Sequence, residues 1–260
     1  MDRKHAEHEA LEAERNARTT RDGVLTEDDI LRLPRLTRDF CSVRALELAP
    51  RLLGTILVRR TPEGLTAGKI IEVEAYEGPE DRACHAFGGR RTRRNEVMYG
   101  PPGRAYVYFT YGMHWMLNVV AAPEGVPHAV LIRSLDPIAG IELMAKRRRG
   151  ALPYAEGPGR LCQALSITGA DNGTGLAEER RAKGERAMKD RAMSAAGSQG
   201  APGAGYDMFI AKPPEGMDSP PPYIVTKRVG VGNSGEAKHY PWRFVVTGTG
   251  PSKMKVDYPE

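Results

Sequence analysis

The sequence predicts an α+β protein: a single domain with a curved, largely antiparallel β-sheet, flanking helices and a protruding β-hairpin. Several short runs rich in β-branched and aromatic residues follow one another in hairpin order, with turn residues between them. Only a few helical patterns interrupt these runs, as expected for a sheet with helices packed against it. The length of 260 residues allows one large domain.

The composition narrows the classes of function. Hydrophobic residues make up 40% and charged residues 27%, values that are ordinary for a soluble protein. The formal net charge of +5 favours an anionic partner, although many ordinary enzymes are as basic. No apolar run could span a bilayer and no secretory signal is evident, so we expect no membrane partner. Three distant cysteines fit reduced thiols, so we expect a cytoplasmic protein (bacterial nucleoid) or a nuclear one, not a secreted one.

The ends of the predicted domain follow from shifts in composition. Residues 1–35 are dense in charge and poor in large apolar side chains, which predicts a disordered tail with, at most, a short solvated helix at 7–15. The domain then occupies 36–260. Within it, charge gives way to alanine, glycine and serine over 178–205, which predicts a mobile or partly helical insertion.

The first predicted elements are a helix and two strands. Ser42 could cap a helix that ends at Gly54 and is kinked or split by Pro50. A strand over 55–60 then turns back into a strand over 69–76.

The strand over 69–76 alternates between apolar and polar residues. Its two faces are Ile71, Val73 and Ala75 on one side and Glu72, Glu74 and Tyr76 on the other. Taken alone, this pattern favours a half-solvated strand with both carboxylates in water. The stretches that follow favour a functional face instead.

A β-hairpin is predicted next, from runs at 104–110 and 115–121 with a glycine in the turn. Tyr111 falls at its tip, where a large aromatic side chain buries little area. A wedge pushed between stacked bases would explain it. Just upstream, the loop 88–94 holds four arginines, Arg90, Arg91, Arg93 and Arg94, and so suits phosphate contacts.

The remaining elements are two helices and four strands. A strand over 129–135 should lead to a helix capped by Asp136 with Pro137 in its first turn. A helix over 161–167 follows the glycine-rich residues 157–159, whose amides either hold a phosphate or form a plain loop. The last predicted strands are at 206–211, 227–232 and 242–247, after a proline-rich connection at 213–222.

Several spaced motifs resemble the alkyladenine (3-methyladenine) DNA glycosylase family. They read EAYxGPEDxAxH, GGRxTxRN, YVYxxYGMxxxxN and LIRxLxP, and continue with GPGRLCQAL, RVGVG and PWRF. The resemblance covers Asp39 to about Lys253, apart from the insertion. Because several spaced motifs occur in the family's order, chance similarity is a poor explanation. It implies a single-domain fold and an enzyme that flips a damaged base out of duplex DNA and hydrolyses its N-glycosidic bond.

The resemblance also implies roles for individual residues. Glu74 matches the general base that activates water, with Glu72 as the rival, and Arg133 matches an arginine that places Glu74 and the water. Tyr76, His85 and Tyr108 match residues of the family's base pocket. Asn118 matches an asparagine of that pocket that tests the exocyclic amino group of guanine. Without the family pattern, Tyr76 and Tyr108 could equally be core aromatics. Tyr111 matches the wedge, and the other expected DNA contacts are Met98, Tyr99 and Met113.

The expected reaction releases alkylated or deaminated purines (the 3-methyladenine, 7-methylguanine and hypoxanthine class) and leaves an abasic site. Electron-rich rings suit cationic bases. Lys69 falls on the face opposite Glu74, so no amine is placed for lyase chemistry, and we expect a monofunctional enzyme that acts as a monomer on double-stranded DNA. No metal-ligand spacing is present, so no metal and no cofactor is expected.

Two other readings stay open at this point. A metal-dependent hydrolase or nuclease could use an acidic cluster of Glu72, Glu74, Glu77, Glu80, Asp81 and His85. A non-catalytic nucleic-acid-binding module could use a related curved sheet, but it would have no special need for Glu74 or the pocket aromatics.

Overall fold

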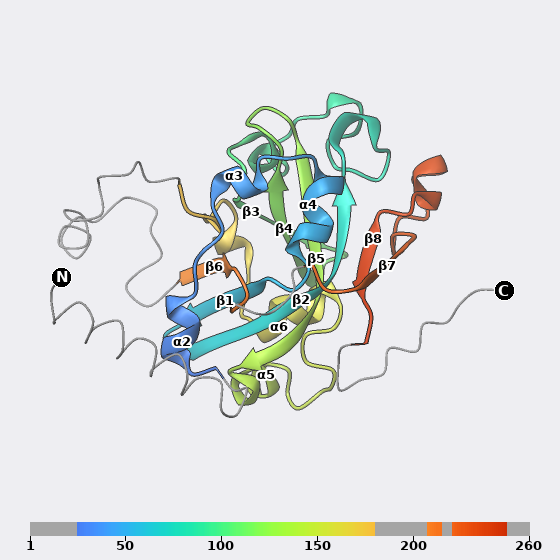
Figure 1. Cartoon of the computed structure of the whole chain (residues 1–260). Coiled ribbons are helices and arrows are strands. Elements are labelled where there is room, and N and C mark those ends of the chain that lie inside the picture. The colour runs from blue at the N-terminus through green and yellow to red at the C-terminus, as the bar shows by residue number, and fades with distance from the viewer. Residues whose placement is uncertain (1–24, 180–206, 215–219, 249–260) are drawn as a thin grey trace, which may run out of the picture.

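The computed structural model describes residues 25–179, 207–214 and 220–248 (Figure 1). The helix expected at 7–15 and most of the insertion expected at 178–205 lie outside these residues. Within them, no helix is long and apolar enough to cross a membrane.

One antiparallel sheet of eight strands forms the frame of the described part, which confirms the predicted fold class. The strand order is β3-β4-β5-β2-β1-β6, and β8 joins β2 and carries β7 on its other side. The strands are β1 (Ile56–Thr61), β2 (Gly64–Tyr76), β3 (Ala105–Thr110), β4 (His114–Ala121), β5 (His128–Ala139), β6 (Asp207–Ala211), β7 (Tyr223–Thr226) and β8 (Arg243–Val246).

The long strand β2 is the centre of this sheet, and it changes partner halfway along. Its first half pairs with β1, whereas Glu72–Glu74 pair with β8. On its other edge β5 follows almost the whole length, with register shifts near Ile70 and Glu72. Such irregularities bend a strand and increase its twist. The bend places the Glu72–Glu74 segment between two strands, with neighbours on both edges.

Both faces of this segment are buried, so the half-solvated reading of the strand is wrong. Glu72 is 4% exposed and Glu74 is fully buried, as are Val73 and Ala75 on the opposite face. Buried carboxylates need ionic or hydrogen-bonding partners. The partners of these two are described with the site.

The helices are short and connect or cover the strands: α2 (Glu27–Arg32), α3 (Arg38–Cys41), α4 (Ala45–Leu52), α5 (Ile141–Arg147) and α6 (Pro158–Ala164). Single 3₁₀ turns are η1 (Gly78–Glu80), η2 (Phe87–Gly89), η3 (Glu96–Tyr99), η4 (Gly169–Asp171) and η5 (Gly235–His239). Ser42 ends α3 instead of capping the next helix, which is preceded by Arg44. Pro50 lies in α4, which ends two residues later instead of kinking.

The predicted helix start at Asp136 is wrong, because β5 continues to Ala139. Asp136 and Pro137 pair with Lys69 and Gly68 of β2, so tertiary pairing overrides the local capping signal. The chain turns at Gly140 (φ 66°), where a Cβ atom would lie 2.1 Å from the carbonyl oxygen of Leu65. Only glycine fits there, and α5 follows it.

Two further expectations need correction. The assigned tail, 1–35, includes α2, where Thr26 accepts a hydrogen bond from the Asp29 amide and Ile30 is fully buried. The expected strand at 227–232 is a loop, and the edge strand is β7 instead. In that loop the Arg228 side chain turns into the protein interior, and Gly230 has a positive φ of 77°.

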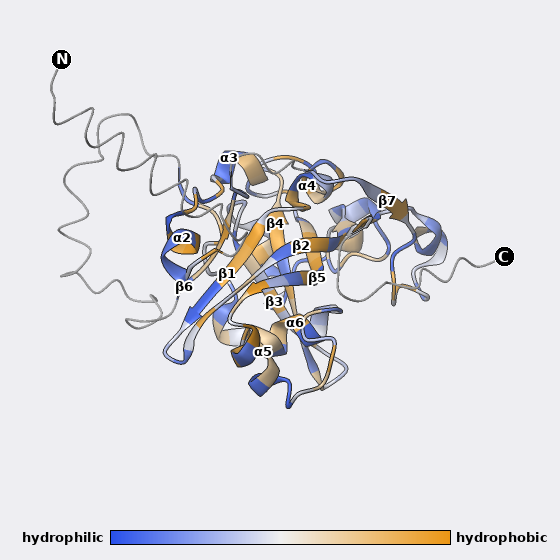
Figure 2. Ribbon diagram, turned by 60° about the horizontal axis from the view of Figure 1, so that its bottom comes forward, coloured by the Kyte–Doolittle hydropathy of each residue, from blue (hydrophilic) through white to orange (hydrophobic). Residues whose placement is uncertain are grey.

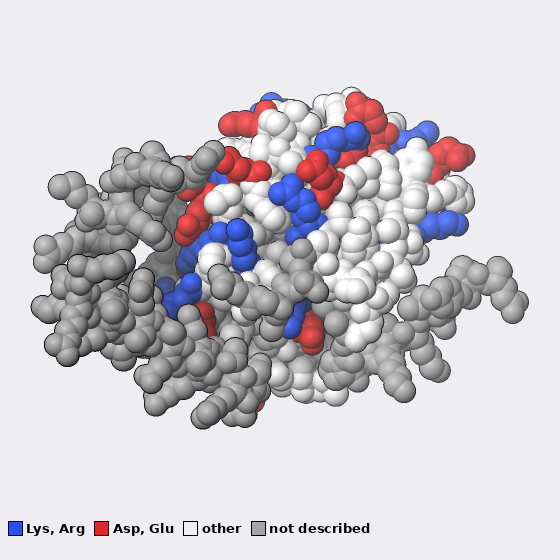
Figure 3. Space-filling model, in the orientation of Figure 1, with Lys and Arg blue, Asp and Glu red and all other residues white. Residues whose placement is uncertain are grey.

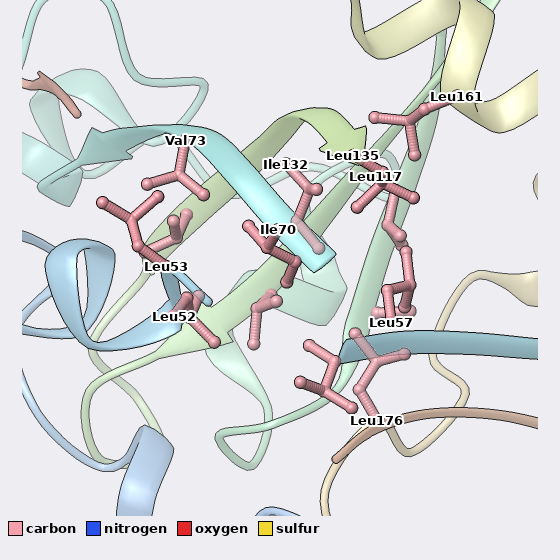
Figure 4. Close-up of a cluster of buried hydrophobic side chains, with 14 of the residues drawn as sticks. Leu52, Leu53, Leu57, Ile70, Val73, Leu117, Ile132, Leu135, Leu161 and Leu176 are labelled. Atoms are coloured by element: carbon pink, nitrogen blue, oxygen red, sulfur yellow. The ribbon is translucent and has the colours of Figure 1, made fainter. Parts of the chain in front are cut away.

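The main hydrophobic core joins the sheet to α4 and α6. Hydrophobic residues concentrate in the central strands β2, β4 and β5 (Figure 2). Figure 4 shows side chains from the sheet, from α4 and α6 and from the adjoining segments meeting in one cluster: Leu52, Leu53, Leu57, Ile70, Val73, Leu117, Ile132, Leu135, Leu161 and Leu176. A second cluster packs Ile30 of α2 against β1 and β6. The packing fixes β2, β3, β4 and β5, the strands that carry the site.

Both ends of the expected insertion contact the same side chain. The Arg35 guanidinium lies 2.6 Å from the Asp207 carboxylate and 3.6 Å from the Glu178 carboxylate. Glu178 also exchanges backbone hydrogen bonds with Leu36 and Arg38, so it belongs to the domain and not to the insertion. A short linker can therefore span the gap between residues 179 and 207.

We expect that replacing residues 181–205 by a short glycine–serine linker leaves the melting temperature and base release close to wild type. The composition of that segment offers little apolar area to bury. The control is the same deletion begun at residue 178, which removes the Glu178 contacts and should lower the melting temperature. A large loss of stability in the shorter deletion would show that the segment packs on the domain.

Candidate active site

A cavity of about 320 Å³ lies where the β3–β4 hairpin, β5 and two loops meet. The loops follow η1 and precede η5. The residues around the cavity are Tyr76, Ala83, Cys84, His85, Met98, Tyr106, Tyr108, Thr110, Tyr111, Met116, Asn118, Ala129, Leu131, Arg133, Pro158, Val229, Gly230 and Val231. The structure thus brings together the predicted pocket residues, Tyr76, His85, Tyr108 and Asn118, with Arg133 and Tyr111.

The aromatic side of the cavity is a packed set of rings. The His85 ring meets the Tyr108 ring edge to face at 4.6 Å between centroids, and Tyr106 lies 5.3 Å from Tyr108. His85 Nδ1 lies 2.8 Å from the Tyr106 hydroxyl, and this hydrogen bond fixes the imidazole plane. A planar ligand would therefore meet rings that are already oriented.

His85 is held in its neutral form. Burial lowers its pKa to about 4, and the charges of Arg94 and Arg90 act in the same direction. A neutral imidazole does not repel a cationic ligand, whereas an imidazolium would. Near neutral pH this wall of the cavity can therefore accept a positively charged ring.

Asn118 of β4 supplies a polar group to the cavity. It is 3% exposed, and its Nδ2 donates to the Tyr106 carbonyl oxygen at 3.0 Å. That bond fixes the orientation of the amide. A fixed polar group in an aromatic pocket can discriminate between ligands by shape and by hydrogen bonding.

Glu74 lies directly behind the cavity wall. Its Oε1 accepts a hydrogen bond from the Val229 amide at 2.7 Å and lies 3.2 Å from Arg133 Nη1, and its Oε2 accepts from the Tyr76 hydroxyl at 2.8 Å. All three partners line the cavity. The carboxylate thus lies against the cavity wall, and each of its oxygens is held by at least one donor.

The two carboxylates of the strand have opposite pKa shifts. Burial raises the pKa of Glu74 above its usual range, and Arg133, the Val229 amide and Tyr76 offset this only in part. Burial also opposes ionisation of Glu72, but Arg133, Ser134 and Arg243 outweigh it, so the pKa of Glu72 is lowered. A raised pKa is the property of a proton acceptor, whereas Glu72 behaves as an ion-pair anchor.

Arg133 connects these carboxylates. Its Nε lies 2.7 Å from Glu72 and its Nη1 contacts Glu74, and its guanidinium also borders the cavity. Glu72 accepts further bonds from the Ser134 hydroxyl and from Arg243 Nε. Glu72 therefore fixes the position of Arg133, which in turn faces Glu74.

The hairpin tip presents Tyr111 to solvent, as predicted. Its side chain is 79% exposed, and the neighbouring Met113 is 68% exposed. Tyr111 (φ 51°) and Gly112 (φ 66°) both have positive φ, as a type I′ turn requires. A bulky residue in that region is strained, and such strain is tolerated mainly at functional positions.

The arginine loop lies beside the cavity, and all four of its arginines are exposed. Arg91 pairs with Glu96 and stacks on Tyr99, and Arg94 donates to the Phe109 carbonyl oxygen. Buried Asn95 shapes the loop by donating to the carbonyl oxygens of His85 and Arg90. Charges of both signs are interspersed on the molecular face in Figure 3.

Met98 and Tyr99 differ from the other predicted DNA contacts, which are exposed. Met98 is 1% exposed and lines the cavity, so it cannot contact a duplex laid on the surface. Tyr99 is half-buried and donates to the Arg90 carbonyl oxygen. Met98 belongs to the pocket and Tyr99 to the support of the loop.

The sequence reasoning missed three residues next to the site. Val229 supplies the amide bound to Glu74, Arg228 holds the same loop, and Tyr106 orients His85. The RVGVG motif was a signal for Val229 and Arg228, but its interpretation as a strand gave the wrong position for both residues. Tyr106 stands beside Tyr108 in the hairpin run and carries no separate signal.

The acidic residues of the metal-dependent reading do not converge. Glu72 and Glu74 share Arg133, Glu77 pairs with Arg44 and the Asp81 carboxylate is held by Arg228. No group of three or more histidine, cysteine or acidic side chains among the described residues is placed to hold a metal ion. The geometry therefore gives no support to this reading.

A buried carboxylate behind an aromatic cavity, beside an exposed tyrosine and a basic loop, fits the class of DNA base-excision repair enzymes that hydrolyse N-glycosidic bonds. Residues 39–250 match the methylpurine-DNA glycosylase family, and the chain belongs to that family. A relative from Bacillus subtilis, named "Putative 3-methyladenine DNA glycosylase", is 43% identical and covers 80% of this chain and 91% of its own. Relatives with that name from Clostridium acetobutylicum and Methanocella arvoryzae are 38% and 42% identical, each covering 82% of this chain and 95% and 92% of their own.

Proposed function

We propose that the protein excises alkylated or deaminated purines, of the 3-methyladenine, 7-methylguanine and hypoxanthine class, from double-stranded DNA. The observation that carries this is the cavity walled by Tyr76, His85 and Tyr108, with Glu74 behind it. An enzyme reaches a base inside a duplex only by flipping it out, and a cavity of about 320 Å³ lined by rings can receive it. All of these residues come from one chain, so a monomer can hold a complete site.

Recognition in this proposal follows from ring electrons and from Asn118. A methylated purine with a positive charge is attracted to the faces of Tyr76 and Tyr108, and neutral His85 does not oppose it. Asn118 then tests the exocyclic amino group of a normal guanine by shape and by hydrogen bonding. Tyr111 fills the gap in the stack left by the extruded base.

The proposed chemistry is hydrolysis with Glu74 as general base. The bond between C1′ and the base nitrogen breaks, its electron pair leaves with the base, and water adds to C1′. Glu74 accepts the proton of that water and offsets the positive charge that develops on the sugar, while Arg133 positions both. No lysine is among the described residues around the cavity, which supports hydrolysis to an abasic site without a lyase step.

The test uses duplexes that each carry one 7-methylguanine or one hypoxanthine, and it measures released base and strand breaks separately. The expected result is free base and an abasic strand that breaks only after alkali. Binding without base release would instead support a non-catalytic nucleic-acid-binding module. Strand breaks without alkali would contradict the monofunctional mechanism.

Base release should not depend on a divalent cation, because Glu74 can activate water without one. We expect equal single-turnover rates in excess chelator and in added magnesium, compared at matched ionic strength because salt alone weakens DNA binding. Activity that disappears in chelator and returns with the metal would overturn this expectation.

A further inference from the structure

The loop that binds Glu74 is held by a buried arginine outside the proposed chemistry. The Arg228 and Asp81 side chains are both fully buried and form a bidentate pair, with distances of 2.5 and 2.8 Å. The two residues are 147 positions apart in the chain. A buried ion pair is weak evidence for stability, because desolvation offsets its attraction. Its geometry is therefore the better guide to its role.

Arg228 makes contacts in several directions at once. Its guanidinium donates to the carbonyl oxygens of Ala75, at the end of β2, and Ala237, in η5. Its Cζ lies 4.7 Å from the centroid of the Tyr76 ring and 4.9 Å from that of Trp242. The next residue along the chain, Val229, is the one whose amide donates to Glu74.

We propose that Arg228, clamped by Asp81, is a positioning residue that holds the Val229 amide on Glu74 and the Tyr76 ring at the cavity wall. This inference rests on the proposed role of Glu74 as the base. In this role, Arg228 influences the protonation of Glu74 and the shape of the pocket, although it does not contact the substrate. Only a planar group with several donors can satisfy two backbone carbonyls, a carboxylate and two rings together, so lysine is not an equivalent replacement.

The clamp acts on a carboxylate with several charged or titratable neighbours. Those that face Glu74 are Arg133 from β5, Glu72 and Tyr76 from its own strand, Tyr108 from β3, Arg243 from the paired strand β8 and Arg228 itself. The Val229 amide is among the groups that favour the ionised form. If the loop shifts and this bond is lost, the carboxylate takes up a proton at higher pH than in the wild type.

The test is the pH profile of single-turnover base release from a duplex with one 7-methylguanine. That base carries a fixed positive charge at N7, and any change in its own N1 protonation is the same for the wild type and the variants, so a difference between their profiles reports the enzyme. Arg228→Lys should move the acid limb to higher pH and lower the rate below the midpoint by about tenfold, because a hydrogen bond to a charged group is worth a factor of that order. At high pH the rate should return toward wild type.

Two variants control this test. Arg59→Lys disturbs another buried arginine pair, with Asp171 at 2.7 Å, which does not line the cavity. It should lower the melting temperature but leave the acid limb unchanged. Asp81→Asn releases the clamp from its other side and should shift the limb as Arg228→Lys does, so it carries the test if that variant fails to fold.

The outcomes separate this inference from the proposed function. A wild-type acid limb that persists in Glu74→Gln, or no such limb at all, would overturn the base role of Glu74 and the clamp with it. A wild-type limb that depends on Glu74 but keeps its midpoint in Arg228→Lys and Asp81→Asn would overturn the clamp alone. A shifted midpoint in both, with none in Arg59→Lys, supports it.

Discussion

Glu74→Gln should slow single-turnover base release by about 10²- to 10⁴-fold, the usual contribution of a general base. The substitution fits the site: the glutamine oxygen can accept from Val229 and Arg133, and its amide can donate to the Tyr76 hydroxyl oxygen. What is lost is the proton acceptor and the negative charge beside the sugar. Duplex binding should survive, because the proposed DNA contacts, the arginine loop and Tyr111, are unchanged.

The folded state of Glu74→Gln should be at least as stable as the wild type near neutral pH. Burial raises the pKa of Glu74, so ionising this carboxyl costs more free energy in the folded protein than in the unfolded chain. The stability linked to that proton is present at low pH and is lost as the pH rises through the folded pKa. A neutral amide avoids this loss. We therefore expect Glu74→Gln to be slower than the wild type, with an unchanged or higher melting temperature.

Glu72→Gln is the matched comparison, and it should differ in both respects. The pKa of Glu72 is lowered, so its ionised form stabilises the fold above the unfolded pKa and this stability fades only in acid. Its loss leaves Arg133 and Arg243 without their shared carboxylate. We expect a lower melting temperature and a smaller rate defect, measured well below that temperature.

The lesion also matters to this comparison. A cationic base leaves readily, so 7-methylguanine should show a smaller defect in Glu74→Gln than hypoxanthine, which needs more help from the enzyme. If Glu74→Gln released both lesions at the wild-type rate while Glu72→Gln did not, the role of base would belong to Glu72.

Local sequence patterns were sufficient to predict the elements whose structure is determined by neighbouring residues. The run to Thr110, the glycine at 112 and the run from Trp115 predict a hairpin, since a type I′ turn needs positive φ and strands alternate their faces. The alternation over β2 put Glu72, Glu74 and Tyr76 on one face correctly. The family resemblance then identified residues that line the cavity, although their catalytic roles stay predictions.

Long-range pairing explains what local patterns could not predict. Asp136 and Pro137 form a good helix start by their local chemistry, yet pairing with β2 keeps them extended. The burial of Glu74 depends on Val229, 155 residues away in the chain. Likewise, the sequence around Arg228 gives no indication that Asp81 is its partner. Such contacts are fixed by the curvature of the whole sheet and not by any segment of it.

Tyr111→Ala should weaken binding to lesion and abasic duplexes by about tenfold or more at fixed salt. A stacked aromatic side chain is worth roughly 1–3 kcal/mol by alanine substitution in proteins that bind single strands. The 79% exposed ring buries little area in the free protein, so its removal should cost the fold almost nothing. Undamaged duplex, in which no base leaves the stack, should lose less affinity.

The turn backbone supplies the matched control for this experiment. Tyr111 has a φ of 51°, which asparagine tolerates better than alanine does. Tyr111→Asn should therefore stabilise the hairpin relative to Tyr111→Ala, while both lack the ring. Equal losses of lesion binding in the two variants, with near wild-type binding in Tyr111→Phe, would assign the effect to the ring. If Tyr111→Asn bound lesions like the wild type, the turn and not the ring would be what binding requires, and the wedge role would fail.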